Sequence, residues 1–347
     1  GIKDEEASSL IGSLMAVLHI GNVQFVAPAN NSEGSEPAKT GESGVALRKC
    51  CELLGVDEGP LCAAWCKKSM KAPGEGVIFI PATCKGASEG RDALARHLYA
   101  ALFAFVVERI NAVVSSDRGE QLPVIGVLDI FGFEYFLTNS LEQLFINFTN
   151  ELLQQYFNEV IFDNETLLYE REGIEWNPLD FPDNKDIVDL LGKAPAGVLP
   201  MLDEECMVVG GSSEQWSSKL QKAHNRSRHF DIVKQRQHNF VIKHFAGPVE
   251  YFSQAFLDKN RDALGADLVN CLKGSRSEFL QQRFGEHDRT FGTQESVSAQ
   301  TGARRNLRAK KYTVASEFRG QLGSLMERIR ATEPHFVRCL KPNPKNQ

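Results

Sequence analysis

The amino-acid sequence predicts an α/β fold that is mostly helical, with an apolar strand that carries polar groups at its carboxyl end. The run VIGVLDI (124–130) is apolar enough for a buried strand and contains Asp129 near its end. A long amphipathic helix follows it, and another apolar helix precedes it. With 347 residues, of which 42% are hydrophobic, the chain can form one large domain or two ordinary ones.

The N-terminal third is predicted to contain three helices and a short strand. Gly21-Asn22 should end the first helix, and the helix over 91–113 is apolar around most of its circumference, so it should be buried on several sides. In order, the expected elements are an apolar helix from residue 7 to 21, the strand VQFV (23–26), a polar loop over 27–44, a helix over 45–55 and the helix over 91–113.

The helix after the apolar strand has the clearest pattern in the chain. Asn139 and Ser140 are good N-caps, and Ser140-x-x-Gln143 fits a capping box. Apolar residues at three- and four-residue steps predict an amphipathic helix of about 24 residues. These apolar positions are Leu141, Leu144, Phe145, Phe148, Leu152, Tyr156 and Val160, with Asn147, Asn150, Glu151, Gln154, Gln155 and Asn158 between them.

The C-terminal half alternates short helices, strands and polar segments. The predicted elements are a helix, a Pro/Gly loop and a second helix within 183–209, a strand pair over 239–252 with a turn or bulge at Gly247-Pro248, a flexible stretch over 292–303, a helix over 314–331 and a strand over 335–340.

Composition excludes several classes of function. A net charge of −6 argues against a nucleic-acid-binding protein, and no uncharged apolar run is long enough to predict a transmembrane segment. The eight cysteines contain no C-x-x-C pair; Cys62-x-x-x-Cys66 could offer two metal ligands, but free thiols in a reducing, cytosolic compartment are the preferred interpretation.

Asp129 and Gly132 form an Asp-x-x-Gly pattern behind the apolar strand. A carboxylate at the carboxyl edge of a sheet can hold a water on Mg²⁺, and a glycine lets a backbone N–H reach a phosphate. The pattern also occurs in ordinary capped turns. Gly41-Glu-Ser-Gly44 resembles the start of a phosphate loop but is followed by VALR, so we predict a plain loop there; Gly-Lys-[Ser/Thr] occurs nowhere in the sequence.

The extended string DIFGFE, with NSLEQLFINFTNELLQQYFN behind it, resembles switch II and the relay helix of the myosin motor domain. Nearly the whole chain matches that family in order. The other matching segments are LHIGNVQF (18–25), DALARHLY (92–99), EGIEW (172–176), GKAPAGVLPMLDEEC (192–206), HFAGPVEY (244–251), FLDKNRD (256–262) and the run from Thr313 to Asn343.

The resemblance implies a P-loop NTPase-like myosin motor fragment, mostly helical, with strands of the central transducer sheet. It assigns 1–122 to the C-terminal part of the upper 50-kDa subdomain and 123–272 to switch II, the relay helix and the lower 50-kDa subdomain. Residues 273–313 would be the end of that subdomain with loop 2, and 314–347 the start of the segment leading to the reactive-thiol helices.

By the same resemblance, Asp129 would contact the Mg²⁺ shell, Gly132 the γ-phosphate of ATP, and Glu134 an arginine of switch I. These would be the catalytic and cofactor-binding residues, with Asp129 an indirect metal ligand. The residues that couple the relay helix to the converter would be Phe145, Phe148, Tyr156 and Trp176.

Two segments resemble actin-binding surfaces. The loop of the predicted helical hairpin should expose Ala196, Val198 and Leu199 for docking on F-actin, although a hairpin that buries its own apolar side chains fits the pattern equally well. A basic segment resembles the end of loop 2, and residues 71–90, with Glu75, Thr83 and Ser88, resemble a further actin-facing loop. The predicted actin-binding residues are Pro195, Ala196, Val198, Leu199, Met201, Arg304, Arg305, Arg308, Lys310 and Lys311.

The family's phosphate loop, switch I, converter and lever arm have no match in this sequence. We therefore expect ATP and Mg²⁺ to act in an intact, cytoplasmic motor on the actin cytoskeleton, and the isolated chain to lack useful ATP affinity and ATPase activity. Light chains or calmodulin would bind only through a lever arm. The alternative is a non-hydrolysing actin-binding protein; a GTPase is disfavoured because Asn-Lys-x-Asp does not occur.

Overall fold

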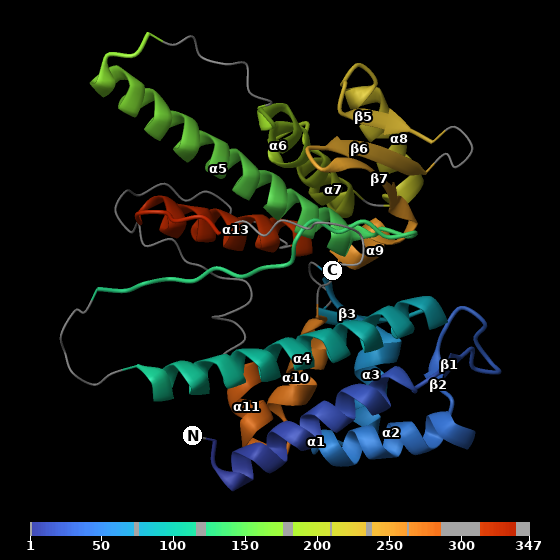
Figure 1. Ribbon diagram of the computed structural model, residues 1–347. Coiled ribbons are helices and arrows are strands. Elements are labelled where there is room, and N and C mark those ends of the chain that lie inside the picture. Colours follow the sequence, from blue (N-terminus) through green and yellow to red (C-terminus); the bar gives the residue numbers. More distant parts are fainter. Residues whose placement is uncertain are drawn as a thin grey trace, which may run out of the picture. The chain divides into compact units, whose positions relative to one another are not determined.

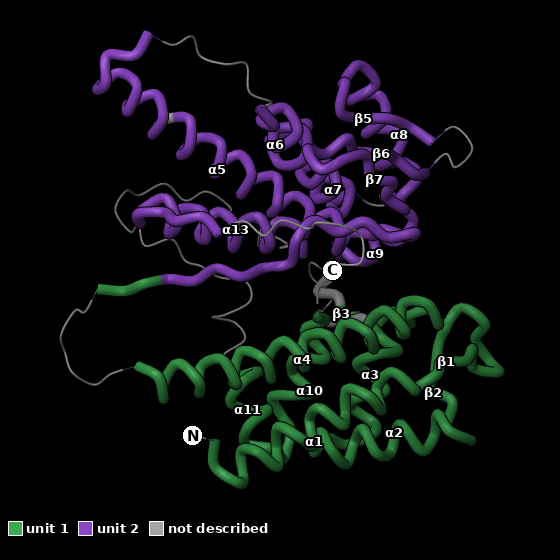
Figure 2. The backbone as a smooth tube through the Cα atoms, viewed as in Figure 1, with its two compact units in different colours: residues 1–125, 263–310 green, residues 126–262, 311–347 purple. Residues whose placement is uncertain are grey.

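The computed structural model describes residues 2–72, 76–115, 123–175, 183–208, 210–233, 238–261, 264–285 and 313–337. The chain forms two compact units, shown in different colours in Figure 2. Unit 1 comprises Gly1–Ile125 and Ala263–Lys310, and unit 2 comprises Gly126–Asp262 and Lys311–Gln347. Each unit therefore contains two separate stretches of sequence.

Unit 1 is a helical unit with two small hairpins (Figure 1). Helix α1 packs against α2 and α4, and α10 packs against α3 and α11. Its core includes Ile20, Leu54, Trp65, Leu98 and Phe284. The elements are α1 (Asp4–Gly21), β1 (Phe25–Val26), β2 (Glu36–Pro37), α2 (Gly41–Leu54), α3 (Glu58–Cys66), β3 (Lys67–Ala72), β4 (Gly76–Pro81), α4 (Cys84–Val114), α10 (Ala266–Lys273) and α11 (Glu278–Gly285).

The predicted N-terminal helix and strand are confirmed, whereas the predicted loop over 27–44 contains β2 and the start of α2. Helix α1 ends at Gly21, and β1 lies within the predicted strand. The predicted loop over 27–44 is wrong at its end, because α2 begins at Gly41 and its first turn contains Gly44. A Cβ on Gly44 would lie 2.0 Å from the carbonyl oxygen of Lys39, so this glycine allows the chain to enter the helix.

Helix α4 includes the predicted 91–113, but its burial was predicted wrongly. Leu94, Leu98 and Phe105 are buried, whereas Tyr99 and Phe103 on another face are 54% and 62% exposed. Only one side of the helix is therefore covered by the parts of the chain that the structure describes. By length and composition alone, α4 is also long and apolar enough to cross a membrane, which we did not predict from the sequence. A single helix of this kind is weak evidence for a transmembrane segment.

Unit 2 is built around α5, which has 32 residues and is longer than predicted. The helix–loop–helix, the strand pair and the C-terminal helix are confirmed as α6–α7, β6–β7 and α13. The turn between the two strands lies at Phe245-Ala246 and not at the predicted Gly247-Pro248, which begin β7. The elements are α5 (Leu141–Glu172), α6 (Lys185–Gly192), α7 (Val198–Met207), α8 (Ser213–His224), β5 (Phe230–Ile232), β6 (Asn239–His244), β7 (Gly247–Phe252), η1 (Ser253–Ala255), α9 (Phe256–Asn260) and α13 (Val314–Arg330).

The predicted strand over 124–130 is not a strand in the structure. The segment is extended, and Val124, Ile125 and Val127 are 87%, 94% and 90% exposed. A strand is stable only when its N–H and C=O groups pair with a neighbour, and none of the three small antiparallel sheets in the described residues provides one here. The predicted strands of a central sheet are therefore not found in this part of the chain.

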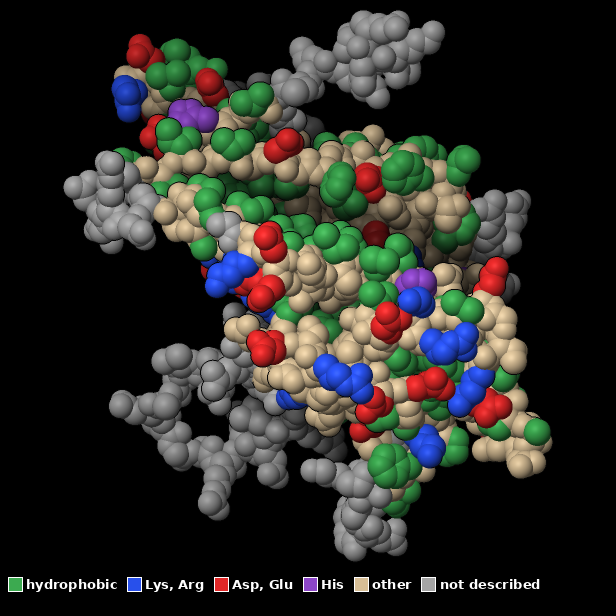
Figure 3. Space-filling view, turned by 90° about the horizontal axis from the view of Figure 1, so that it is seen from below, with side chains coloured by type: hydrophobic (Ala, Val, Ile, Leu, Met, Phe, Trp, Pro, Cys, Tyr) green, Lys and Arg blue, Asp and Glu red, His purple; other side chains and the backbone are tan. Residues whose placement is uncertain are grey.

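The strand predicted over 335–340 is wrong for residues 335–337, which have no regular structure, and its remainder lies outside the described residues. The stretch predicted as flexible, 292–303, also lies outside them. Exposed apolar side chains also occur on helices, for example Leu18 on α1 and Phe103 on α4. Figure 3 shows apolar side chains among charges of both signs on one face.

Seven described cysteines are free thiols, in agreement with the prediction; Cys339 lies outside the described residues. Burial raises the pKa of Cys51 to about 11 and that of Cys62 to about 12, so both thiols are poor nucleophiles at neutral pH. Cys50 and Cys66 are also buried.

Candidate functional site

The segment that carries Asp129, Gly132 and Glu134 crosses unit 2 as an extended chain before α5. Asp129 and Gly132 are exposed, and Glu134 is partly buried. A Cβ placed on Gly132 would meet nothing within 4 Å, so its backbone is open to an approaching group. The Asp129 carboxylate is an oxygen donor of the kind that hard cations such as Mg²⁺ prefer, and the open glycine leaves room for a phosphate. The donor types thus fit part of a Mg-nucleotide site.

Asn147 of α5 holds the backbone of Glu134 at two points. Its Oδ1 accepts the N–H of Glu134 at 2.8 Å, and its Nδ2 donates to the carbonyl oxygen of Glu134 at 2.9 Å. The Nδ2 of Asn150, one turn further on, donates to the carbonyl of Phe131 at 3.1 Å. Gln143 Nε2 lies 3.3 Å from the Glu134 carboxylate. The position of this segment is therefore set by the first three turns of α5.

The start of α5 is fastened to the rest of unit 2. The predicted capping box is confirmed, with the Ser140 N–H donating to Gln143 Oε1 at 2.9 Å. Asn139 has a different role from the predicted cap: its Nδ2 donates to the carbonyl of Glu250 at 3.0 Å, and its own carbonyl accepts the N–H of Phe252. These two hydrogen bonds fix the residue before the N-cap of α5 to strand β7.

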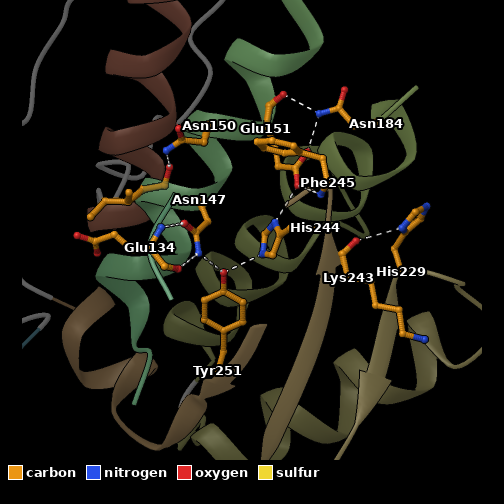
Figure 4. Close-up of polar contacts among 11 residues, drawn as sticks. Glu134, Asn147, Asn150, Glu151, Asn184, His229, Lys243, His244, Phe245 and Tyr251 are labelled. Carbon is orange, nitrogen blue, oxygen red and sulfur yellow. Dashed lines mark hydrogen bonds and ion pairs between the residues drawn. The ribbon is translucent and has the colours of Figure 1, made fainter. Parts of the chain in front are cut away.

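A buried polar network continues from Asn147 into the unit (Figure 4). Asn147 Nδ2 lies 2.9 Å from the hydroxyl of Tyr251, which lies 2.8 Å from His244 Nε2. His244 Nδ1 lies 2.9 Å from Glu151 Oε1, and Asn184 Nδ2 donates to Glu151 Oε2 at 2.6 Å. All five residues are buried, and none is more than 6% exposed.

This network was not predicted from the sequence, in which Asn147 and Glu151 stand between the apolar positions of the helix without an evident role. The available signal was their i, i+4 spacing, which puts both on one face of α5 next to a phenylalanine-rich stripe. Their partners His244 and Tyr251 lie about a hundred residues away and could not be assigned from spacing.

Of the four predicted coupling residues, Phe148 and Tyr156 lie in the core of unit 2 and Phe145 is partly buried against it. Phe145 stacks on Phe318 of α13 with ring centroids 4.3 Å apart, and Phe148 lies 6.5 Å from the same ring. The ring centroids of Tyr156 and Phe336 are 6.0 Å apart. Trp176 lies outside the described residues. Helix α5 and α13 are thus joined by aromatic packing.

The hairpin between α6 and α7 differs from the predicted actin-facing loop. Pro195 and Ala196 are exposed, but Val198 and Leu199 are fully buried and Met201 is half-buried. The expectation that Val198 and Leu199 are exposed is wrong, because both lie in the first turn of α7 and pack into the core. The alternative, a hairpin that buries its own apolar residues, describes these two positions.

A groove of about 560 Å³ lies beside this hairpin. Its walls include the exposed loop residues Pro195 and Ala196, His224 at the end of α8, and Arg228 after it. His224 Nε2 bonds the carbonyl of Ala196 at 2.7 Å, and Arg228 pairs with Asp186 at 3.0 Å. The basic segment with Arg304, Arg305, Arg308, Lys310 and Lys311 lies outside the described residues.

The comparisons with known proteins agree over the full chain. The myosin head (motor domain) family matches residues 1–347. The chain is 38% identical to Protein OPAQUE1 of Zea mays over 347 residues, and 40% identical to unconventional myosin-Vc of Homo sapiens over 348 residues. These alignments cover 100% and 99% of the chain. The chain spans only 22% and 20% of the two relatives, about a fifth of their length. On this evidence from its whole length, the chain belongs to the myosin head (motor domain) family.

Proposed function

We propose that this chain is part of an actin-based motor that couples Mg-ATP hydrolysis to movement along actin filaments. The observation that carries the proposal is the family match over all 347 residues together with the attachment of the Glu134 segment to α5 by Asn147. A segment that senses a phosphate and is fixed to a long helix can convert a small shift into motion of that helix.

Three residues have proposed roles at the nucleotide. Asp129 holds a water of the Mg²⁺ shell, Gly132 offers its N–H to the γ-phosphate, and Glu134 pairs with a switch I arginine. When bound, Mg²⁺ supplies charge neutralisation at the phosphates. The P-loop NTPase-like fold belongs to the whole motor, and the chain alone, without Gly-Lys-[Ser/Thr], should have no ATPase activity.

The proposed actin surface combines an exposed loop with a basic segment. Pro195 and Ala196 face outward, whereas Val198 and Leu199 hold the loop from within and Met201 borders it. The basic residues 304–311 would speed encounter with acidic actin in a salt-dependent manner. Phe145, Phe148, Tyr156 and Trp176 would transmit motion of α5 to the converter.

The remaining assignments follow the same proposal. Residues 1–122, 123–272, 273–313 and 314–347 correspond to successive parts of the motor from the upper 50-kDa subdomain onward. ATP and Mg²⁺ are its cofactors and F-actin its partner, in the cytoplasmic actin cytoskeleton. Light chains or calmodulin would bind a lever arm outside this chain.

The test uses the native protein that contains this chain, captured with an antibody to residues 139–176. Mass spectrometry should find G-x-x-x-x-G-K-[ST] upstream, and the protein should show an actin-activated Mg-ATPase. Glu134→Ala should lower kcat roughly 100-fold, because a group that positions the reaction is lost. Exposed Glu33→Ala is the control and should leave kcat unchanged. A native protein without a phosphate loop, with actin binding that ATP does not release, would replace the motor with the non-hydrolysing alternative.

A further inference from the structure

The buried network in unit 2 is a continuous chain of hydrogen bonds. Asn147 Nδ2 has two hydrogens, one for the Glu134 carbonyl and one for the Tyr251 oxygen. The Tyr251 hydroxyl also bonds His244 Nε2, and the other ring nitrogen of His244 bonds Glu151 Oε1. Because each of these side chains bonds at least two neighbours, none of them can turn without breaking a hydrogen bond.

The far end of the network is the start of α6. Asn184 occupies the N-cap position of α6, but its side chain does not cap the helix. Its Nδ2 donates to both the carbonyl oxygen and Oε2 of Glu151, at 2.8 and 2.6 Å. Glu151 Oε1 also accepts the N–H of Phe245 at 3.0 Å, next to the β6–β7 turn. The network therefore joins the Glu134 segment to the base of the α6–α7 hairpin within one unit.

We propose that Asn147, Tyr251, His244, Glu151 and Asn184 form a positioning relay that sets the backbone of Glu134 according to the position of the α6–α7 hairpin. This inference rests on the proposed function, in which Glu134 faces nucleotide and the hairpin faces actin. Displacement of α6 moves Asn184, and the hydrogen bonds from Asn184 through Glu151, His244 and Tyr251 to Asn147 pass the displacement to the two-point hold on Glu134.

The first measurement is amide hydrogen exchange, resolved to single residues, on the full 347-residue chain. Tyr251→Phe removes one hydroxyl that does not touch Glu134. The Glu134 amide should exchange roughly fivefold faster, because Asn147 loses a fixing bond. The Phe136 amide, held at 2.8 Å by Asn139 Oδ1, is an internal control and should not change.

Tyr99→Phe is the control variant. Tyr99 lies on α4 in unit 1 and is 54% exposed, and it belongs neither to the relay nor to the residues with proposed roles in the motor. It should leave both amides unchanged. If folded Tyr251→Phe protects Glu134 as well as wild type does, the relay is refuted. If Tyr251→Phe does not fold, as judged by its melting curve, the second variant decides.

The second variant, Asn184→Ala, cuts the link to α6 and leaves the Tyr251–Asn147–Glu134 bonds intact. In wild type, F-actin should change Glu134 exchange by about fivefold or more. In Asn184→Ala this response should disappear, with basal exchange unchanged and the actin Kd within about twofold of wild type. A retained response overturns the link to the hairpin. If wild type does not bind actin, the proposed function fails, and positioning of Glu134 by Tyr251 is judged by the first measurement.

Discussion

At the scale of single residues, the ion pair at the start of α5 offers a pH test. Lys259 Nζ lies 2.7 Å from Glu142 Oε2 and 2.9 Å from Ser140 Oγ. Partial burial opposes ionisation of Glu142, but the hydrogen bond from Lys259 and further bonds outweigh it and lower the pKa below the ordinary 4.5. A depressed carboxyl pKa stabilises the fold above the unfolded-state value and ceases to do so as the pH falls through the folded-state value.

Glu142→Gln should therefore lower the Tm by roughly 1–2 °C at pH 7, because the pair is partly exposed. The difference from wild type should shrink as the pH falls below about 4.5 and vanish once the pH is below the lowered pKa of Glu142. Exposed Glu165→Gln on the same helix is the control and should match wild type throughout. A difference that does not shrink at all as the pH falls below 4.5 would show that packing, not ionisation, is responsible.

The residue scale also shows where sequence reasoning stopped. Asp129, Gly132 and Glu134 could be singled out because the Asp-x-x-Gly pattern and the string DIFGFE are local features of the sequence. Asn147 and Glu151 could not, because polar residues between apolar positions usually face water. Only the tertiary partners His244 and Tyr251, on β6 and β7, make their burial favourable, and a single sequence does not reveal such pairs.

At the scale of elements, the close contact between α6 and α5 gives a packing test. A Cβ on Gly192 would lie 2.5 Å from Cζ of Phe148, whose ring is 5% exposed in the core. Gly192→Ala must therefore displace Phe148 or α6, and we expect it to lower the free energy of unfolding by about 1–3 kcal/mol. Urea denaturation monitored by circular dichroism measures this change.

Gly320→Ala in α13 is the matched control within the same unit. A Cβ there meets nothing within 4 Å, so alanine's better helix propensity should stabilise the protein by about 0.5–1 kcal/mol. The contact at Gly192 would be disproved if both alanine variants were equally stable.

Elements differed in how well the sequence predicted them, for a physical reason. Helices α1, α5, α7 and α13 make their hydrogen bonds locally, so caps and periodicity predict them. The run over 124–130 is as apolar as a strand, but a strand's hydrogen bonds are made by another segment. Without a partner strand among the described residues, it remains extended and exposed.

At the scale of the whole molecule, the two hydrophobic cores are separate. The core of unit 1 contains Trp65 and Leu98, that of unit 2 contains Trp216, and each core consists of residues from one unit only. Residues that share one hydrophobic core unfold cooperatively. Because each unit has a core of its own, we expect two separate unfolding transitions. Each core has a fully or almost fully buried tryptophan as its own reporter, since Trp65 is 2% and Trp216 0% exposed.

Single-tryptophan variants separate these reporters. Trp176→Phe with Trp216→Phe leaves Trp65 to report on unit 1, and Trp176→Phe with Trp65→Phe leaves Trp216 to report on unit 2. Leu98→Ala, at a fully buried position, should create a cavity that destabilises unit 1 by about 2–5 kcal/mol. In urea, the Trp65 fluorescence transition should move to lower concentration while the Trp216 transition stays in place. Equal shifts of both transitions would mean that the two units unfold as one cooperative unit.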